Sequence, residues 1–126
     1  MIALDTDVLI EILDRKSEKG NEALAKILQS GEQVFTTAIN IHEILYGLHK
    51  FGKPVKEILL LPILNYSKND AVLSSKIELE AEKKGNPIRR TDTMIAAIAI
   101  NNGAMLYTFD LRHFNPIKIL GLKLFP

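Results

Sequence analysis

The chain has 126 residues, of which 47% are hydrophobic and 25% are charged. These proportions are typical of a globular protein, and the length predicts a single domain, residues 1–126, with a full hydrophobic core. Sixteen Lys and Arg residues nearly balance fifteen Asp and Glu residues, so any phosphate recognition must be local. Because cysteine is absent, disulfides, thiolate metal sites and a cysteine nucleophile are excluded, and a metal would need oxygen or imidazole ligands.

The first residues contain neither a basic leader nor a cleavable apolar segment, because Asp5 and Asp7 interrupt the apolar run. No apolar run elsewhere approaches the ~20 residues that a membrane span requires. We therefore expect a cytoplasmic protein that has no membrane partner.

The N-terminal half of the chain predicts an alternation of strands and helices. Ile2, Ala3 and Leu4 fit a strand buried on both faces at the middle of a parallel sheet, although a short buried helix has the same pattern. The residues that follow predict a helix over 8–13, a helix over 23–31, a strand over 33–37, a helix from Ala38 to the Lys53-Pro54 step, and a short helix over 55–60.

The C-terminal half continues the alternation. Residues 61–66 form a strand candidate in which Pro62 favours an edge position. Ser67 to Asp70 has the form of a capping box, and a helix follows it to about Gly85. The remaining pattern predicts an apolar helix over 92–102 that is buried nearly all round, a buried strand over 104–108 and a final strand over 117–125.

Strands that alternate with helices throughout predict an α/β fold, a three-layer α/β/α sandwich around a mainly parallel sheet. In such a sheet the strand C-termini and the following helix N-termini share one edge, where ligands bind. Asp5 ends the first strand, Asp92 opens the buried helix, and Asp110 follows the strand at 104–108. These three carboxylates should therefore converge, and Glu43 borders the apolar stripe of its helix.

Each of the four acids also has a structural explanation. Asp5, Thr6 or Asp7 could merely cap the helix that follows, and of these we favour Asp7 as the cap and Asp5 as a site residue. Asp92 alone could interact only with the helix dipole, Glu43 could be a boundary residue, and Asp110 an ordinary turn residue. Together, however, four crowded acids would repel one another unless they were protonated or bridged by a hard divalent cation. Such a site activates water and neutralises a phosphodiester in the transition state.

Four segments resemble the acidic motifs of PIN-domain ribonucleases, in particular the VapC-type toxins, in the order of that family. They are LDTDVLI (Leu4 to Ile10), INIHEILYGL (Ile39 to Leu48), RRTDTMIAAIAI (Arg89 to Ile100) and LYTFDLRHF (Leu106 to Phe114). The resemblance implies a PIN-like fold in which Asp5, Glu43, Asp92 and Asp110 form the acidic quartet that binds Mg²⁺ or Mn²⁺ for hydrolysis of RNA, single-stranded or structured. It also implies a homodimer and an antitoxin that covers the acidic groove.

Within this resemblance, we expect Asp5 and Asp92 to contact the principal metal directly, and Glu43 and Asp110 to act through water or to orient the attacking hydroxide. The position of Asp7 is often Asn in the family, so a further charge stands there. Thr6 and Thr108 match frequent polar companions of the site. Four basic residues flank the acids and are candidate contacts for substrate phosphates: Arg89, Arg90, Arg112 and His113. The alternative for these four is a solvated surface cluster.

Other interpretations stay open at this point. Asp5-Thr6-Asp7 also resembles the opening motif of haloacid-dehalogenase-like phosphatases, although no downstream Lys with a paired-acid motif is found. A receiver domain would need an Asp after the strand at 61–66, where Ser67 stands instead. His42 and His49 lie seven residues apart, so the zinc-protease motif fails. A non-catalytic PIN-like binding module is the remaining alternative.

Overall fold

Five short parallel strands form the centre of the fold, in the order β3-β2-β1-β4-β5. The computed structural model describes residues 1–126. The strands are β1 (Ile2–Leu4), β2 (Val34–Thr37), β3 (Ile63–Leu64), β4 (Met105–Tyr107) and β5 (Lys123–Leu124). Strand β1 lies in the middle and pairs with β2 on one side and β4 on the other. The predicted parallel α/β fold and the central place of the first strand are confirmed.

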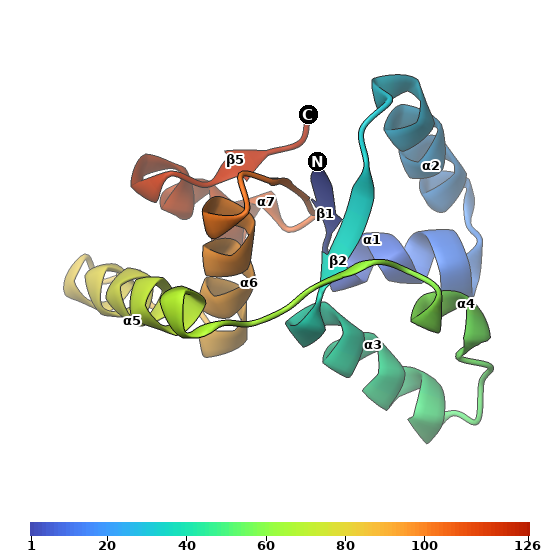
Figure 1. The fold of residues 1–126 in the computed structure, drawn as a ribbon, viewed down its shortest axis with the longest axis horizontal. Helices are drawn as coiled ribbons and strands as arrows, with labels where there is room; N and C mark the ends of the chain where they lie inside the picture. The colour runs from blue at the N-terminus through green and yellow to red at the C-terminus, as the bar shows by residue number, and fades with distance from the viewer.

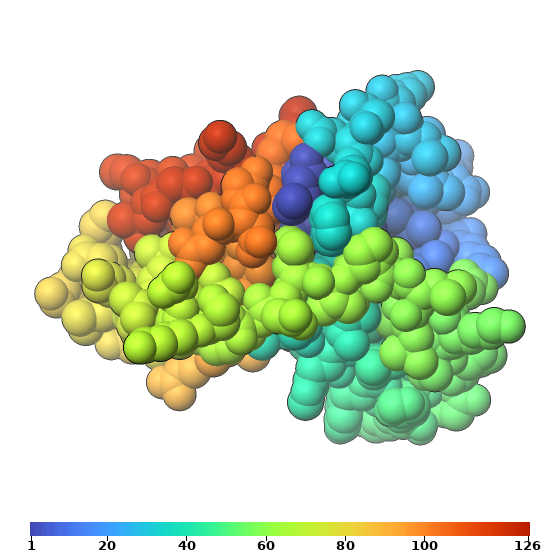
Figure 2. Space-filling view, viewed as in Figure 1, coloured from blue at the N-terminus to red at the C-terminus, as the bar shows by residue number.

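Helices cover both faces of this sheet (Figure 1). In chain order they are α1 (Thr6–Leu9), the π-helical turn η1 (Ile10–Arg15), α2 (Glu18–Ser30), α3 (Ala38–Lys50), α4 (Lys56–Leu59), α5 (Lys68–Lys83), α6 (Arg90–Asn101), α7 (Leu111–Phe114) and the 3₁₀ turn η2 (Asn115–Leu120). Helices α1 to α4 lie on one side of the sheet, and α5 and α6 lie on the other. The segment that joins α4 to α5 crosses the face shown in Figure 2.

Two hydrophobic cores follow from this arrangement, one on each face of the sheet. Alternation along β1 sends Ile2 and Leu4 into the core shared with α1 to α4, whereas Ala3 points into the core shared with α5, α6 and η2. Helix α6 supplies most of the second core, and its residues from Ile95 to Ala99 are fully buried, as its apolar sequence predicts. This burial fixes the position of the N-terminus of α6, where Asp92 lies.

The C-terminal region differs from the prediction. The predicted strand over 117–125 is wrong for most of its length, because η2 occupies residues 115–120 and only Lys123–Leu124 pairs with β4. Pro116 has no backbone N–H for a strand ladder, and Gly121 adopts a left-handed φ of 111° that ends the turn. Ile119, read as a strand residue, is therefore 78% exposed.

Two boundaries elsewhere also differ. Helix α1 begins at Thr6, and Asp5 is its N-cap, since the Asp5 side chain accepts a hydrogen bond from the Thr6 N–H. The prediction that Asp7 is the cap is wrong, because Asp7 lies inside the first turn. The strand predicted over 61–66 shrinks to β3 at the sheet edge, in agreement with Pro62. No helix of the structure has the length and apolar character needed to cross a membrane.

The approach of α2 to η1 depends on Gly20, and this generates a first prediction. A Cβ on Gly20 would lie 2.1 Å from the backbone oxygen of Glu11. We expect Gly20→Ala to lower the free energy of unfolding by about 1–3 kcal/mol, because overpacking outweighs the gain in helix propensity. In the control Gly47→Ala on α3, where nothing lies within 4 Å, stability should rise by about 0.5–1 kcal/mol. Urea unfolding measures both, and shifts of the same sign would contradict this account.

Candidate active site

Asp5 lies at the carboxyl end of the central strand, and three hydrogen bonds fix both of its carboxylate oxygens. Oδ1 accepts from the Asn40 side-chain amide at 2.8 Å and from the Thr6 N–H at 2.9 Å. Oδ2 accepts from the hydroxyl of Thr108, which follows β4, at 2.7 Å. The structure thus joins the ends of β1 and β4 through one buried carboxylate, as the shared sheet edge predicts.

Asn40 on α3 organises the other side of this carboxylate. Its amide also donates to the Thr6 hydroxyl at 2.9 Å, and its carbonyl oxygen accepts from the Thr37 hydroxyl at 2.7 Å. The Thr6 hydroxyl in turn donates to Glu43 at 2.9 Å. Thr6 therefore connects Glu43 to Asp5 through a continuous polar network. Asn40 was not among the predicted site residues, although a polar residue one helical turn before Glu43 is a signal that could have identified it.

Asp92 lies in the first turn of α6 and is only 2% exposed. The Arg89 guanidinium donates to both of its oxygens, at 3.1 and 3.3 Å. This hydrogen bonding and the charge of Asp92 raise the pKa of Arg89, and the charges of Glu43 and Asp110 raise it further. Arg89 thus lies in the combined field of three of the four predicted acids.

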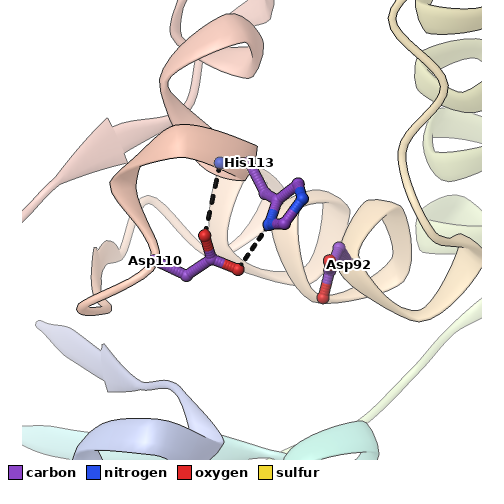
Figure 3. Close-up of side chains that lie close together, drawn as sticks. All are labelled: Asp92, Asp110 and His113. Atoms are coloured by element: carbon purple, nitrogen blue, oxygen red, sulfur yellow. Dashed lines mark hydrogen bonds and ion pairs between the residues drawn. The ribbon is translucent and has the colours of Figure 1, made fainter.

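Asp110 caps α7 and faces Asp92 together with His113 (Figure 3). One Asp110 oxygen lies 2.6 Å from His113 Nδ1, and the other accepts from the His113 N–H at 3.4 Å. The possible ligand atoms of Asp92, Asp110 and His113 all lie within 4.8 Å of one another. His113 was predicted only as a phosphate contact, and α7 is what turns its ring toward the acids.

The charge of this region is costly to maintain. Burial, followed by the nearby charge of Asp7 and with a smaller contribution from Asp92, raises the pKa of Asp5 to about 6. Burial likewise raises the pKa of Asp7, which accepts one hydrogen bond from the Phe109 N–H at 3.1 Å. The other Asp7 oxygen is buried and has no hydrogen-bond partner. An orphaned oxygen beside other carboxylates is the arrangement that a cation would relieve.

These donors fit a hard divalent cation. Carboxylate oxygens predominate, a single imidazole stands beside them, and Mg²⁺ commonly uses one or two direct carboxylates and water. Asp92, Asp110 and His113 are close enough together to share one ion, and Asp5 and Asp92 interact through their charges.

No hydrogen bond or ion pair joins the remaining predicted basic residues to this cluster. Arg90 donates to both oxygens of Glu78 on α5, at 3.0 Å each, so the structure does not bring it to the acids. Arg112 is exposed on α7. His42 and His49 are exposed on α3, which agrees with their interpretation as surface residues.

A family model described as the PIN domain matches residues 2–118. The chain belongs to the PIN domain family. Ribonuclease VapC2 of Haemophilus influenzae is 29% identical over 95% of this PIN domain chain and 92% of its own length. The tRNA(fMet)-specific endonuclease VapC of Salmonella typhimurium is 27% identical over 96% of this chain and 93% of its own.

Solved PIN domain structures agree with this assignment. In the VapBC2 complex of Rickettsia felis bound to a promoter DNA fragment, the matching chain has a TM-score of 0.82 and 26% identity, over 99% of this chain and 98% of that one. The matching chain of FitAcB from Neisseria gonorrhoeae has a TM-score of 0.78 and 26% identity, and the match covers 100% of this chain and 97% of that one. The resemblance to VapC-type PIN domains is confirmed, and the phosphatase and receiver-domain interpretations are no longer favoured.

The raised pKa of Asp5 predicts a pH-dependent stability for the PIN domain in EDTA. Because the folded-state pKa of about 6 exceeds the ordinary 3.8, the folded state binds the extra proton, and the free energy of unfolding falls as pH rises through this window. Asp5→Asn removes the ionisable carboxyl group and therefore the unfavourable free energy of its buried charge. Its stability relative to the wild type should therefore increase between pH 4 and pH 8, by up to about 3 kcal/mol.

Urea unfolding at a series of pH values measures this difference. Asp14→Asn serves as the control, because Asp14 pairs with Lys53 at the surface, at 3.0 Å. A stability difference between wild type and Asp5→Asn that stays constant from pH 4 to pH 8 would show that Asp5 carries no such penalty.

Proposed function

We propose that the protein is an Mg²⁺- or Mn²⁺-dependent endoribonuclease that hydrolyses phosphodiester bonds of single-stranded RNA. One observation carries the proposal: the end of the central strand and the starts of α6 and α7 bring Asp5, Asp92 and Asp110 to one edge of the sheet, where burial raises the pKa of Asp5. The similarity to VapC ribonucleases supports the same activity.

In this proposal Asp5 and Asp92 hold the principal metal directly, and Glu43 and Asp110 hold it through water or orient the attacking hydroxide. A bound divalent ion supplies Lewis-acid polarisation of the phosphodiester and lowers the pKa of coordinated water. The protein supplies the positions of its ligands. Asn40 and Thr108 fix the Asp5 oxygens. Thr6 fixes Glu43, and His113 fixes Asp110.

Arg89 is the basic residue best placed to receive a substrate phosphate. Its guanidinium contacts Asp92, yet its side chain is 68% exposed and can turn toward solvent. Arg112 is a second candidate, since it is exposed on the same short helix as His113. We do not assign Arg90 to the substrate, because Glu78 binds its guanidinium through two hydrogen bonds.

We further propose that the protein is the toxin of a toxin-antitoxin pair, acts as a homodimer on cytoplasmic RNA, and folds as one PIN-like unit over residues 1–126. Support for the antitoxin comes from the solved relatives, which include the VapBC2 complex of Rickettsia felis and a DNA-bound VapBC complex of Salmonella typhimurium. An antitoxin segment with a basic side chain would complement the acidic edge of the sheet.

Cleavage of a mixed-sequence single-stranded RNA that carries a fluorophore and a quencher tests this function. We expect cleavage in Mg²⁺ or Mn²⁺ and none in EDTA. Since loss of a residue that merely supports a metal ligand costs about 10–100-fold, Asp92→Asn should reduce the rate at least ~100-fold. Asp14→Asn, a surface carboxylate paired with Lys53, is the matched control and should cleave at the wild-type rate.

Two outcomes would refute the nuclease. Absence of cleavage in both metals, together with hydrolysis of small phosphomonoesters that Asp5→Asn abolishes, would favour a phosphatase. RNA binding without any cleavage would favour a non-catalytic PIN-like binding module.

A further inference from the structure

An open cleft of about 560 Å³ borders the acidic edge of the sheet on the side of η1 and α2. Asp7 and Asp110 line it from the acidic site, and Phe109 lies in its wall. Arg15 and Lys19 are the two basic residues of its lining. We call this region the Phe109 cleft. None of its basic or aromatic residues has a role in the proposed metal chemistry.

The ring of Phe109 is held in a fixed position beside the acids. Its backbone N–H donates to Asp7 at 3.1 Å, and its ring packs edge-on against Tyr107, with the ring centroids 5.8 Å apart. Lys19 Nζ lies over the Phe109 ring, 4.1 Å from its centroid. The Lys19 side chain is exposed, and it must move for a base to stack on the part of the ring that it covers.

The energies favour exchange of this lysine for a nucleobase. An exposed cation–π contact contributes about 0.5–1 kcal/mol, whereas stacking of a base on an aromatic side chain contributes about 1–3 kcal/mol. The displaced ammonium would remain in the cleft, within reach of the phosphate attached to the stacked nucleotide. Base and phosphate would then be recognised by neighbouring residues.

Charges around the cleft permit an anion to enter. Glu11 is already paired with Arg15 at 3.4 Å and accepts a hydrogen bond from Ser17 at 3.0 Å. The Arg15 side chain is 70% exposed, so it retains N–H donors that face solvent. Lys19 and Arg15 therefore supply the positive charge of a cleft that the carboxylates of Glu11, Asp7 and Asp110 also line.

We propose that the Phe109 cleft binds the nucleotide next to the scissile phosphate of an RNA strand, with the base stacked on Phe109 and its phosphate bound by Lys19 and Arg15. This inference rests on the proposed nuclease function and adds a subsite to it. The subsite explains how a strand is held at an edge whose own side chains are mainly acidic.

Equilibrium binding tests the subsite separately from cleavage. The probe is a fluorescein-labelled, mixed-sequence RNA hexanucleotide, measured by anisotropy in Mg²⁺ with protein that carries Asp92→Asn. Adding Lys19→Gln should weaken binding about fivefold and lower the slope of log Kd against log salt by ~0.7, as loss of one phosphate contact requires. Adding Phe109→Leu, which keeps an apolar side chain, should weaken binding about tenfold.

Lys26→Gln is the matched control. Lys26 is also on α2 and lies over aromatic rings, 5.7 Å from the Tyr107 centroid and 5.8 Å from that of Phe125, but it does not line the cleft. It should bind the probe like the parent. A second probe with 2-aminopurine at each position in turn reports stacking directly, because its fluorescence should fall on binding to the parent and not to Phe109→Leu.

Three results would overturn the proposal: equal effects of Lys19→Gln and Lys26→Gln, unchanged 2-aminopurine fluorescence in the parent, or no binding of the hexanucleotide by the parent. If Phe109→Leu fails to fold by circular dichroism, Lys19→Gln and the parent's 2-aminopurine signal still decide. If RNA binding depends on Lys19 but the wild-type protein cleaves no RNA, the binding subsite is supported and the nuclease function is refuted.

Discussion

The buried carboxylate of Asp5 is the constraint on which the rest of the structure depends. A charge at the end of a strand buried on both faces is unfavourable unless its surroundings compensate it, and here a side chain from α3 and one from the end of β4 donate hydrogen bonds to it. These donors fix the position of α3 and of the β4 end relative to the central strand. The polar site therefore also determines how three elements of the fold meet.

The hydrogen bonds do not remove the full cost of the charge. The pKa of Asp5 stays raised, and one oxygen of Asp7 has no partner. Such a site suits the cation proposed above, because a bound ion would relieve repulsion already present in the folded protein. Arg89 partly substitutes for such an ion by neutralising Asp92. The crowding that lowers folding stability is thus also the feature on which the proposed metal site depends.

Much of the fold and part of the site could be predicted from the sequence. The sequence predicts Asp5 because it ends an apolar strand and Asp92 because it opens an apolar helix, and the burial of α6 follows from its composition. The role of Asn40 could not be predicted in the same way, since its partners come from the end of β2 and the start of α1. The ring of His113 faces Asp92 only because Asp110 starts a helix there. The 3₁₀ turn replaced a predicted strand because tertiary packing, which buries Ile117, outweighed β propensity.

The hydrogen bond from Thr108 to Asp5 joins residues 103 positions apart. Strand β1 leaves the ribosome well before its neighbour β4, because α1 to α6 lie between them in the chain. Contacts of such long sequence separation form late in folding. A nascent chain that has not reached β4 therefore lacks both the Thr108 donor to Asp5 and the carboxylate of Asp110. For an enzyme that cleaves RNA, this order of assembly keeps unfinished chains inactive beside the message that encodes them.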